Sequence, residues 1–233
     1  MARALPQRFM KGDLEPVPHG PPSTDSVDPA RQHVLWDQDA CESWHAALAA
    51  YPAAVTAYGG ARLMALDRWY HDEWPAAVRA RPRPSVSQEE LLRVIRWKMG
   101  RGVWRERNLR LAEQNPEQEV VDRTGAALAA VPDPRAPVVE IARLRGVGPA
   151  TASAVLAALQ PAHYPFLDET VAAQVRGLGR PAFTVPYYLA YATALRARAT
   201  ALTARCAHEP WTAHAVDLAL WTFAMTDTAA AMR

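Results

Sequence analysis

The sequence predicts an all-α fold, and two observations support this class. Strand patterns are scarce, because no alternation of β-branched residues extends beyond Phe183–Val185. Apolar stretches with helical spacing are abundant, and prolines such as Pro186 and Pro210 stand where the first turn of a helix tolerates them. With 233 residues, of which 50% are hydrophobic and 21% charged, the chain is long enough to bury a core.

The chain divides into an N-terminal tail and one domain. Residues 1–30 contain six prolines and few large apolar side chains, which predicts an irregular or disordered tail. The apolar pattern starts just after it, so we expect residues 31–233 to form a single all-α domain. No internal repeat of fixed period is present.

Helical patterns follow one another along this domain. The first begins at His33–Trp36 and breaks at Tyr51–Pro52, and the next, Val55–Leu66, is interrupted at Gly59–Gly60. After a linker at Arg81–Ser85, the Ser87–Glu90 segment forms a capping box before an apolar run. Further helices are expected over 104–114, 116–131, 168–175, 186–206 and 210–225.

The two cysteines, Cys41 and Cys206, are isolated from each other in sequence, so neither a CxxC metal site nor an iron–sulfur cluster is predicted. A single disulfide is one alternative, but we expect reduced thiols in an intracellular protein. The N-terminus lacks the apolar core of a signal peptide, and no stretch of about 18 apolar residues could span a membrane. The expected location is nuclear in a eukaryote or cytoplasmic in a bacterium, with no cofactor and no membrane partner.

The most informative segment, Ile141–Leu159, predicts two helices joined by a tight turn. Gly146 and Gly148 can reverse the chain because they have no Cβ. Val147 between them is expected to point into the core. Pro149 opens the second helix at a position where its missing N–H costs little.

Such a hairpin leaves backbone N–H groups free at a helix N-terminus, where they can bind a phosphate. Binding of this kind reads no base and is therefore independent of DNA sequence. The predicted contacts to DNA are Gly146, Val147, Gly148, Ala150 and Thr151. The alternative is an ordinary turn between two helices that contains two glycines.

The Leu144–Ala152 segment resembles the hairpin signature of the helix-hairpin-helix DNA glycosylase superfamily. In that family a catalytic aspartate follows the hairpin, and Asp168 stands 18 residues after Ala150. The resemblance covers Ile141–Val175. It implies a helical DNA-repair fold in which Asp168 would stabilise the positive charge that develops on the sugar when a flipped base is released.

The sequence also departs from the family. Bifunctional members carry a lysine nucleophile where this chain has Ala150, so a monofunctional N-glycosylase without lyase activity is expected. About 45 residues separate Trp97 from Leu144, fewer than the family places there, which predicts an incomplete helical barrel. Asp168 is also a favourable N-cap, a purely structural alternative. A DNA-binding or protein-interaction scaffold without activity therefore stands as the alternative function.

A cluster of basic residues lies upstream of the hairpin. The net charge of the chain is only +2, so a nucleic-acid surface would have to arise from local clustering. We expect Lys98, Arg101 and Arg105 to face DNA, and Trp97 and Trp104 to lie in the core. Residues 93–110 contain seven basic side chains, and the only acidic one is Glu106. The basic residues are Arg93, Arg96, Lys98, Arg101, Arg105, Arg107 and Arg110.

Histidines and acids elsewhere show no spacing typical of a metal site. His71–Glu73 predicts a solvated helix end, and His214 a residue flanking a helix. Trp211, Leu218 and Trp221 have the spacing of a buried helix face.

Overall fold

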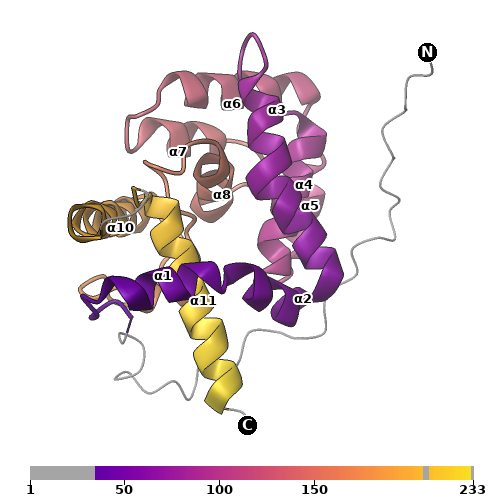
Figure 1. The fold of residues 1–233 in the computed structure, drawn as a ribbon. Coiled ribbons are helices and arrows are strands. Elements are labelled where there is room, and N and C mark those ends of the chain that lie inside the picture. The colour runs from indigo at the N-terminus through magenta and orange to yellow at the C-terminus, as the bar shows by residue number, and fades with distance from the viewer. Residues whose placement is uncertain (1–34, 207–209, 232–233) are drawn as a thin grey trace, which may run out of the picture.

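The computed structural model describes residues 35–206 and 210–231, and this part of the chain is helical, without strands. The predicted all-α class is confirmed, whereas the predicted tail at residues 1–30 lies outside the described residues. The elements, shown in Figure 1, are α1 Cys41–Ala49, α2 Tyr51–Arg68, η2 Trp69–Glu73 (a π-helical turn), α3 Trp74–Arg79, α4 Gln88–Gly100, α5 Glu106–Ala112, α6 Glu117–Ala129, α7 Ala136–Ile141, α8 Pro149–Leu159, α9 Glu169–Ala172, α10 Val185–Arg205 and α11 Ala213–Ala231.

The breaks predicted in the first helical stretch are present. Ala50 ends α1 and α2 starts at Tyr51, with Pro52 in its first turn. Gly60 adopts a φ of 65° inside α2, a conformation that a side chain would disfavour, and this kinks the helix. The predicted interruption at Gly59–Gly60 is therefore confirmed.

α4 begins with the predicted capping box. The Ser87 hydroxyl accepts a hydrogen bond from the Glu90 backbone N–H at 3.2 Å, and the Glu90 carboxylate accepts one from the Ser87 N–H at 2.8 Å. The same carboxylate pairs with Arg81, which anchors the linker before the helix. α4 ends at Gly100 and α5 starts only at Glu106, so the basic stretch is divided between two helices.

α8 is the central helix of the fold (Figure 1), in contact with α3, α4, α7 and α10. All ten residues from Ala150 to Leu159 are buried. Five of these are alanines, whose small side chains allow neighbouring helices to approach closely. A helix that is buried on every side has no polar face, and its exposed part is therefore its N-terminal end, at the hairpin.

The C-terminal helices α10 and α11 complete the fold. α11 runs across α1 and also packs against α2, α9 and α10 (Figure 1). α10 and α11 begin near the expected prolines, and the helix expected over 168–175 is reduced to the single turn α9. Trp211 and Trp221 are buried as their spacing predicted, while Leu218 is half-buried.

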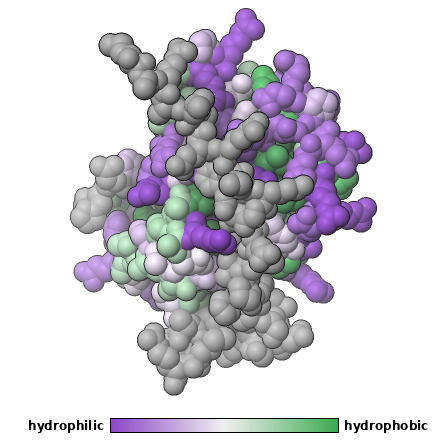
Figure 2. Space-filling model, turned by 90° about the vertical axis from the view of Figure 1, so that its right-hand side faces the viewer, coloured by the Kyte–Doolittle hydropathy of each residue, from purple (hydrophilic) through white to green (hydrophobic). Residues whose placement is uncertain are grey.

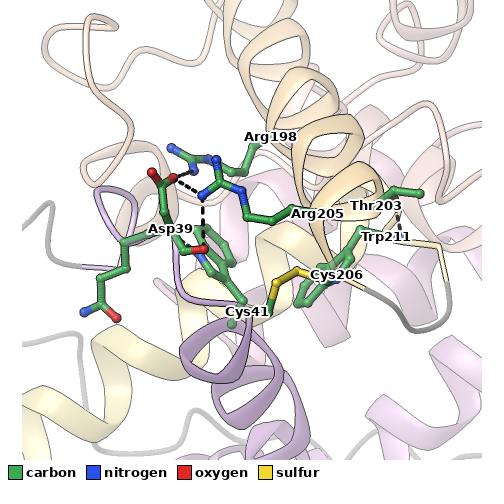
Figure 3. The surroundings of a disulfide bond; sticks show 9 residues. Asp39, Cys41, Arg198, Thr203, Arg205, Cys206 and Trp211 are labelled. Carbon is green, nitrogen blue, oxygen red and sulfur yellow. Dashed lines mark hydrogen bonds and ion pairs between the residues drawn. A yellow bond between two sulfur atoms is a disulfide. The ribbon is translucent and has the colours of Figure 1, made fainter.

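A disulfide joins Cys41 and Cys206, so our expectation of reduced thiols is wrong. The bond links the start of α1 to the end of α10, two segments that are 165 residues apart in sequence. Figure 3 shows Arg205 next to this bond, donating to the backbone oxygen of Asp39 and pairing with its carboxylate. The sequence could not predict this pairing, because the proximity of the two cysteines depends on the packing of both helices.

In the described part of the chain, none of the helices combines the length and the apolar character that crossing a bilayer requires.

Candidate nucleic-acid interface

The hairpin between α7 and α8 is a tight turn whose two glycines have different surroundings. The Val147 N–H donates to the Leu144 carbonyl at 3.2 Å, and Gly146 in the third position of this turn has a φ of 73°. A Cβ at Gly146 would lie 2.2 Å from the backbone oxygen of Asn108 in α5. Gly146 is therefore required for packing as well as for the turn.

Gly148, in contrast, is exposed, and a Cβ placed on it would meet no atom within 4 Å. It is the N-cap of α8, and no side chain caps this end of the helix. The N–H groups of Thr151 and Ala152 donate to the Gly148 carbonyl at 3.0 and 2.9 Å. An anion could approach the start of α8 through the open space at Gly148.

The other predicted hairpin contacts are buried. The side chains of Val147, Ala150 and Thr151 have little solvent exposure, so none of them could offer its side chain to a ligand at the surface. Val147 points into the core, as predicted. For these three residues, contact with DNA through the backbone alone stays a prediction. The Thr151 N–H already donates to the Gly148 carbonyl.

The hairpin is held to the end of α5 by one buried side chain, Asn115. Its amide nitrogen donates to the backbone oxygens of Ala112, at 2.9 Å, and Arg145, at 3.0 Å. Its amide oxygen accepts from the Arg145 N–H at 2.8 Å. Because both backbone groups of Arg145 are fixed in this way, its exposed side chain starts from a defined position, three residues before Gly148.

Asp168 lies at the end of a loop that α8 and α10 hold in place. The Ser153 hydroxyl of α8 accepts a hydrogen bond from the Leu167 N–H at 2.9 Å, and the Tyr191 hydroxyl of α10 donates to the Phe166 carbonyl at 2.8 Å. Asp168 itself is the N-cap of α9, accepting from the Thr170 N–H at 2.8 Å. The structural role that the sequence allowed for Asp168 is therefore confirmed.

Asp168 is only 8% exposed, and its carboxylate faces a buried cation. Its Oδ2 lies 3.9 Å from Nη2 of Arg101, the C-cap residue that follows α4. Burial raises the pKa of Asp168 above its ordinary value, although the positive charge of Arg101 opposes this shift.

Our expectation that Arg101 faces DNA is wrong, because only 3% of its surface is exposed. Its guanidinium carbon lies 4.4 Å from the ring centre of Trp221 and 5.1 Å from that of Trp97. Arg101 Nη1 donates to the Tyr51 hydroxyl at 3.4 Å, while Nε and Nη2 have no hydrogen-bond partner among the described residues. A cation so enclosed needs negative charges nearby.

Two further aspartates supply such charge. Asp67 accepts hydrogen bonds from Tyr51 at 2.6 Å and from Trp97 at 2.8 Å. Asp217 lies fully buried in α11. Burial disfavours the charged form of Arg101, but Tyr51 and the three aspartates, including Asp168, raise its pKa above the ordinary value.

Two histidines extend this buried network, so our expectations for them are wrong. His71 is half-buried in η2, not at a solvated helix end, and its Nδ1 lies 3.2 Å from the Asp67 carboxylate. His71 Nε2 lies 3.1 Å from Nε2 of His214, which is buried in α11. Burial lowers the pKa of His214 well below its ordinary value, so this ring is neutral.

Asp217 completes the network. The Tyr191 hydroxyl donates to its Oδ1 at 3.2 Å, and Oδ2 lies 3.2 Å from His214 Nδ1, where the alignment for a hydrogen bond is poor. Burial raises the pKa of Asp217 to about 7, while Arg101 and Tyr191 oppose the shift. Within the described residues, no three His, Cys, Asp or Glu side chains are placed to hold a metal ion.

The basic cluster does not form one continuous surface. Arg96 pairs with Glu113 at 3.9 Å and Arg110 with Glu106 at 3.1 Å, whereas Arg105 and Arg107 are exposed. Figure 2 shows the side of the molecule on which α4 and α5 lie in Figure 1, with hydrophilic residues gathered over the upper and right-hand part and weakly hydrophobic residues at the lower left. The basic residues are thus divided among α4, α5 and the segment between them.

The expectations for the remaining members of this stretch differ in outcome. Trp97 is fully buried, as predicted, whereas Trp104 is only partly buried and packs at the edge of the core. Lys98 is half-buried and Arg105 exposed, so their contact with DNA stays a prediction.

Sequence reasoning missed Asn115, Asp67 and Asp217. Asp217 carried a signal, since it is the lone charged residue in the apolar run Ala213–Ala224, and a charge there must be paired or neutral when buried. Asn115 carried none, because its partners are backbone groups brought near by the fold.

No family model matches the chain, and neither does any curated protein or solved structure.

Proposed function

We propose that this protein binds the sugar–phosphate backbone of DNA through the α7–α8 hairpin. The observation that carries the proposal is the open N-terminus of α8, where exposed Gly148 leaves room for a phosphate and exposed Arg145 flanks it. Backbone N–H groups and the helix dipole favour an anion at this position. Arg145 adds a charged donor suited to phosphate oxygens.

Lys98 and Arg105 are the further candidates for backbone contacts. Arg105 is fully available at the surface between α4 and α5, and Lys98 is partly so. Neither belongs to a base-reading element, so the proposed binding is independent of DNA sequence.

The test is binding of fluorescently labelled duplexes followed by anisotropy over a range of salt concentrations. We expect similar affinities for duplexes of unrelated sequence, and a log–log salt slope of about −0.9 for each phosphate contacted. Absence of binding at low salt, or binding that does not weaken as salt is added, would contradict the proposal.

Base excision by Asp168 is the second candidate, favoured by the rigid loop that fixes this carboxylate after the hairpin. Against it stand the 8% exposure of Asp168 and its Arg101 partner, because a sugar could contact this carboxylate only after both side chains had moved. Its test is release of bases from a panel of damaged duplexes by the wild type and by Asp168→Asn. Release that is lost in the variant while duplex binding persists would establish it, and no release from any lesion would dismiss it.

A further inference from the structure

Short contacts connect four side chains in a line from α2 through η2 to α11. Nδ1 of His71 lies 3.1 Å from the backbone oxygen of Asp67 and 3.2 Å from its carboxylate. Nε2 of His71 lies 3.1 Å from Nε2 of His214, and Nδ1 of His214 lies 3.2 Å from Oδ2 of Asp217. The line therefore joins a half-buried residue of η2 to a fully buried acid of α11.

The two histidine rings meet edge to edge. Their centres are 5.3 Å apart, close to the largest separation that a 3.1 Å contact between one atom of each ring allows, and their planes differ by 19°. Nε2 of each ring is thus directed at the other ring. One proton has to lie between these atoms, because two lone pairs or two N–H groups would repel each other at this distance.

The partners of each ring determine which nitrogen carries a proton. A backbone carbonyl can only accept a hydrogen bond, so Nδ1 of His71 is protonated, and Nε2 of the neutral ring accepts. Nε2 of His214 then donates, which leaves a lone pair on its Nδ1. This atom and Oδ2 of Asp217 have no other hydrogen-bond partner among the described residues, so the proton between them belongs to Asp217. Burial, which raises the pKa of Asp217 to about 7, agrees with this arrangement.

We propose that Asp217, His214 and His71 form a proton relay that connects the buried acid of α11 to solvent at η2. The proton on Oδ2 of Asp217 passes to Nδ1 of His214, and the proton on Nε2 of His214 passes to Nε2 of His71. The products are a carboxylate at Asp217, the other neutral tautomer of His214 and an imidazolium at His71, so that no proton is gained or lost. The contact between Asp217 and His214 is short but poorly aligned, and the first transfer therefore requires a rotation of the carboxyl group.

His71 is the member of the relay that can exchange a proton with water. Its side chain is 20% exposed, against 5% and 0% for the other two members. Its neighbour Asp67 accepts hydrogen bonds from Tyr51 and Trp97, which favour the ionised carboxylate, and this negative charge stabilises an imidazolium beside it. His71 also lies in a π-helical turn, a feature that is frequent at functional sites.

The groups around the buried end of the relay keep both proton arrangements accessible. Arg101 packs on Trp221, one helical turn after Asp217, and Tyr191 donates to Oδ1 of Asp217. Both favour the carboxylate, whereas burial favours the protonated acid. The other titratable groups that surround the relay are Tyr51 and Tyr58 of α2, Tyr70 of η2, Asp168 at the start of α9, Tyr188 of α10 and His45 of α1.

The test is two-bond heteronuclear NMR of the full chain, labelled with nitrogen-15 at its histidine rings, from about pH 5 to about pH 8. We expect His214 to stay neutral and to carry its proton on Nε2 at low pH and on Nδ1 at high pH, once Asp217 has ionised. Nε2 of His71 should gain a proton in the same transition. A His214 ring that is protonated on one nitrogen throughout would overturn the relay, and this measurement on the wild type requires no variant to fold.

Variants at the two ends of the relay test its members. In Asp217→Asn, the amide can donate to His214 but has no proton to transfer, so we expect the proton of His214 to stay on Nε2 at every pH. Asp72→Asn, at an exposed position, is the matched control and should keep the transition. A transition that persists in Asp217→Asn would overturn the role of this acid.

The exit to solvent is tested by His71→Phe, which keeps an aromatic ring but cannot accept a proton. We expect exchange of the His214 ring proton with water to slow by at least about tenfold in this variant. An exchange rate equal to that of the wild type would overturn the route through His71.

Discussion

At the hairpin, a methyl group added at Gly146 would lie 2.2 Å from the backbone oxygen of Asn108, whereas one added at Gly148 would meet no atom within 4 Å. Gly146 also has a positive φ, and Gly148 does not. Two glycines separated by one residue thus have separable roles. The first maintains the packing of the hairpin against α5, and the second keeps the start of α8 open.

Substitution of these glycines should separate stability from binding. We expect Gly146→Ala to lower the free energy of unfolding by about 1–3 kcal/mol, because both the backbone conformation and the contact with α5 are strained. Gly148→Ala should change it by less than about 0.5 kcal/mol, as at an ordinary surface position. Urea denaturation of the two variants measures the difference, and equal losses would contradict the assignment.

At the level of single residues, the sequence predicted Asp168 as an N-cap and Val147 as a buried residue, and both are confirmed. The prediction from the sequence placed Arg101 at the surface, because periodicity alone cannot show that a side chain at the end of a helix points into the core. Burial of Arg101 depends on partners from α2, α9 and α11, which no local pattern brings together. The candidate site could therefore be predicted as a segment, but not as an arrangement of side chains.

Among the helices, the contact between α5 and the hairpin depends on Asn115, whose amide satisfies three backbone groups in a buried setting. Removing this amide leaves the N–H and carbonyl of Arg145 without partners, and a buried unpaired polar group costs about 1–3 kcal/mol.

We therefore expect Asn115→Ala to lower the free energy of unfolding by about 1–3 kcal/mol. Asn108→Ala, in which the exposed side chain of α5 is truncated, is the matched control and should have little effect. Thermal and urea unfolding of the two variants provide the comparison. Equal stability of Asn115→Ala and the wild type would show that the amide does not hold the hairpin.

The starts of the helices were well predicted, since Ser87, Pro149 and Asp168 act locally through capping and proline geometry. The lengths of the helices were predicted less well. The helix expected over 168–175 is reduced to one turn, because the chain turns again at Gly177 and Gly179, both with positive φ. Local signals determine the first residue of a helix more reliably than its length, because the length also depends on tertiary packing.

For the molecule as a whole, a buried polar network crosses the core from α2 to α11 through Arg101. Its groups are partly neutral, since burial holds His214 uncharged and raises the pKa of Asp217 to about 7. In the unfolded chain Asp217 would titrate near 3.9. The folded state therefore binds more protons at this site across the interval between these two values.

This difference has a definite sign. The contribution of Asp217 to stability is fully present below about pH 4 and is lost as the pH rises through about 7. His214 acts in the opposite direction, because its lowered pKa costs stability as the pH falls below about 6.5. Comparison of the wild type with Asp217→Asn isolates the first effect.

We expect the stability of Asp217→Asn relative to the wild type to increase between pH 5 and pH 8, by an amount of the order of 1–3 kcal/mol. The Tyr191 hydroxyl can still donate to the amide oxygen that replaces Oδ1. Asp72→Asn, at an exposed position, is the control and should show no such dependence. A constant difference between Asp217→Asn and the wild type across this pH range would contradict the assignment.

The all-α class followed from the sequence because helical periodicity and capping are local properties. The Cys41–Cys206 disulfide and the network around Arg101 did not, because both join segments that are distant along the chain.

The central claim, that the open start of α8 binds a DNA phosphate, is tested most directly by the affinity of Gly148→Glu for duplex DNA. A carboxylate at this position would occupy the open space and repel phosphate, while Gly148→Ala and Ala201→Glu, the latter on the exposed surface of α10, control for the side chain and for the charge. We expect Kd for Gly148→Glu to rise at least about tenfold relative to both controls, a loss of about 1.4 kcal/mol or more. Equal affinities of all three variants would contradict the claim.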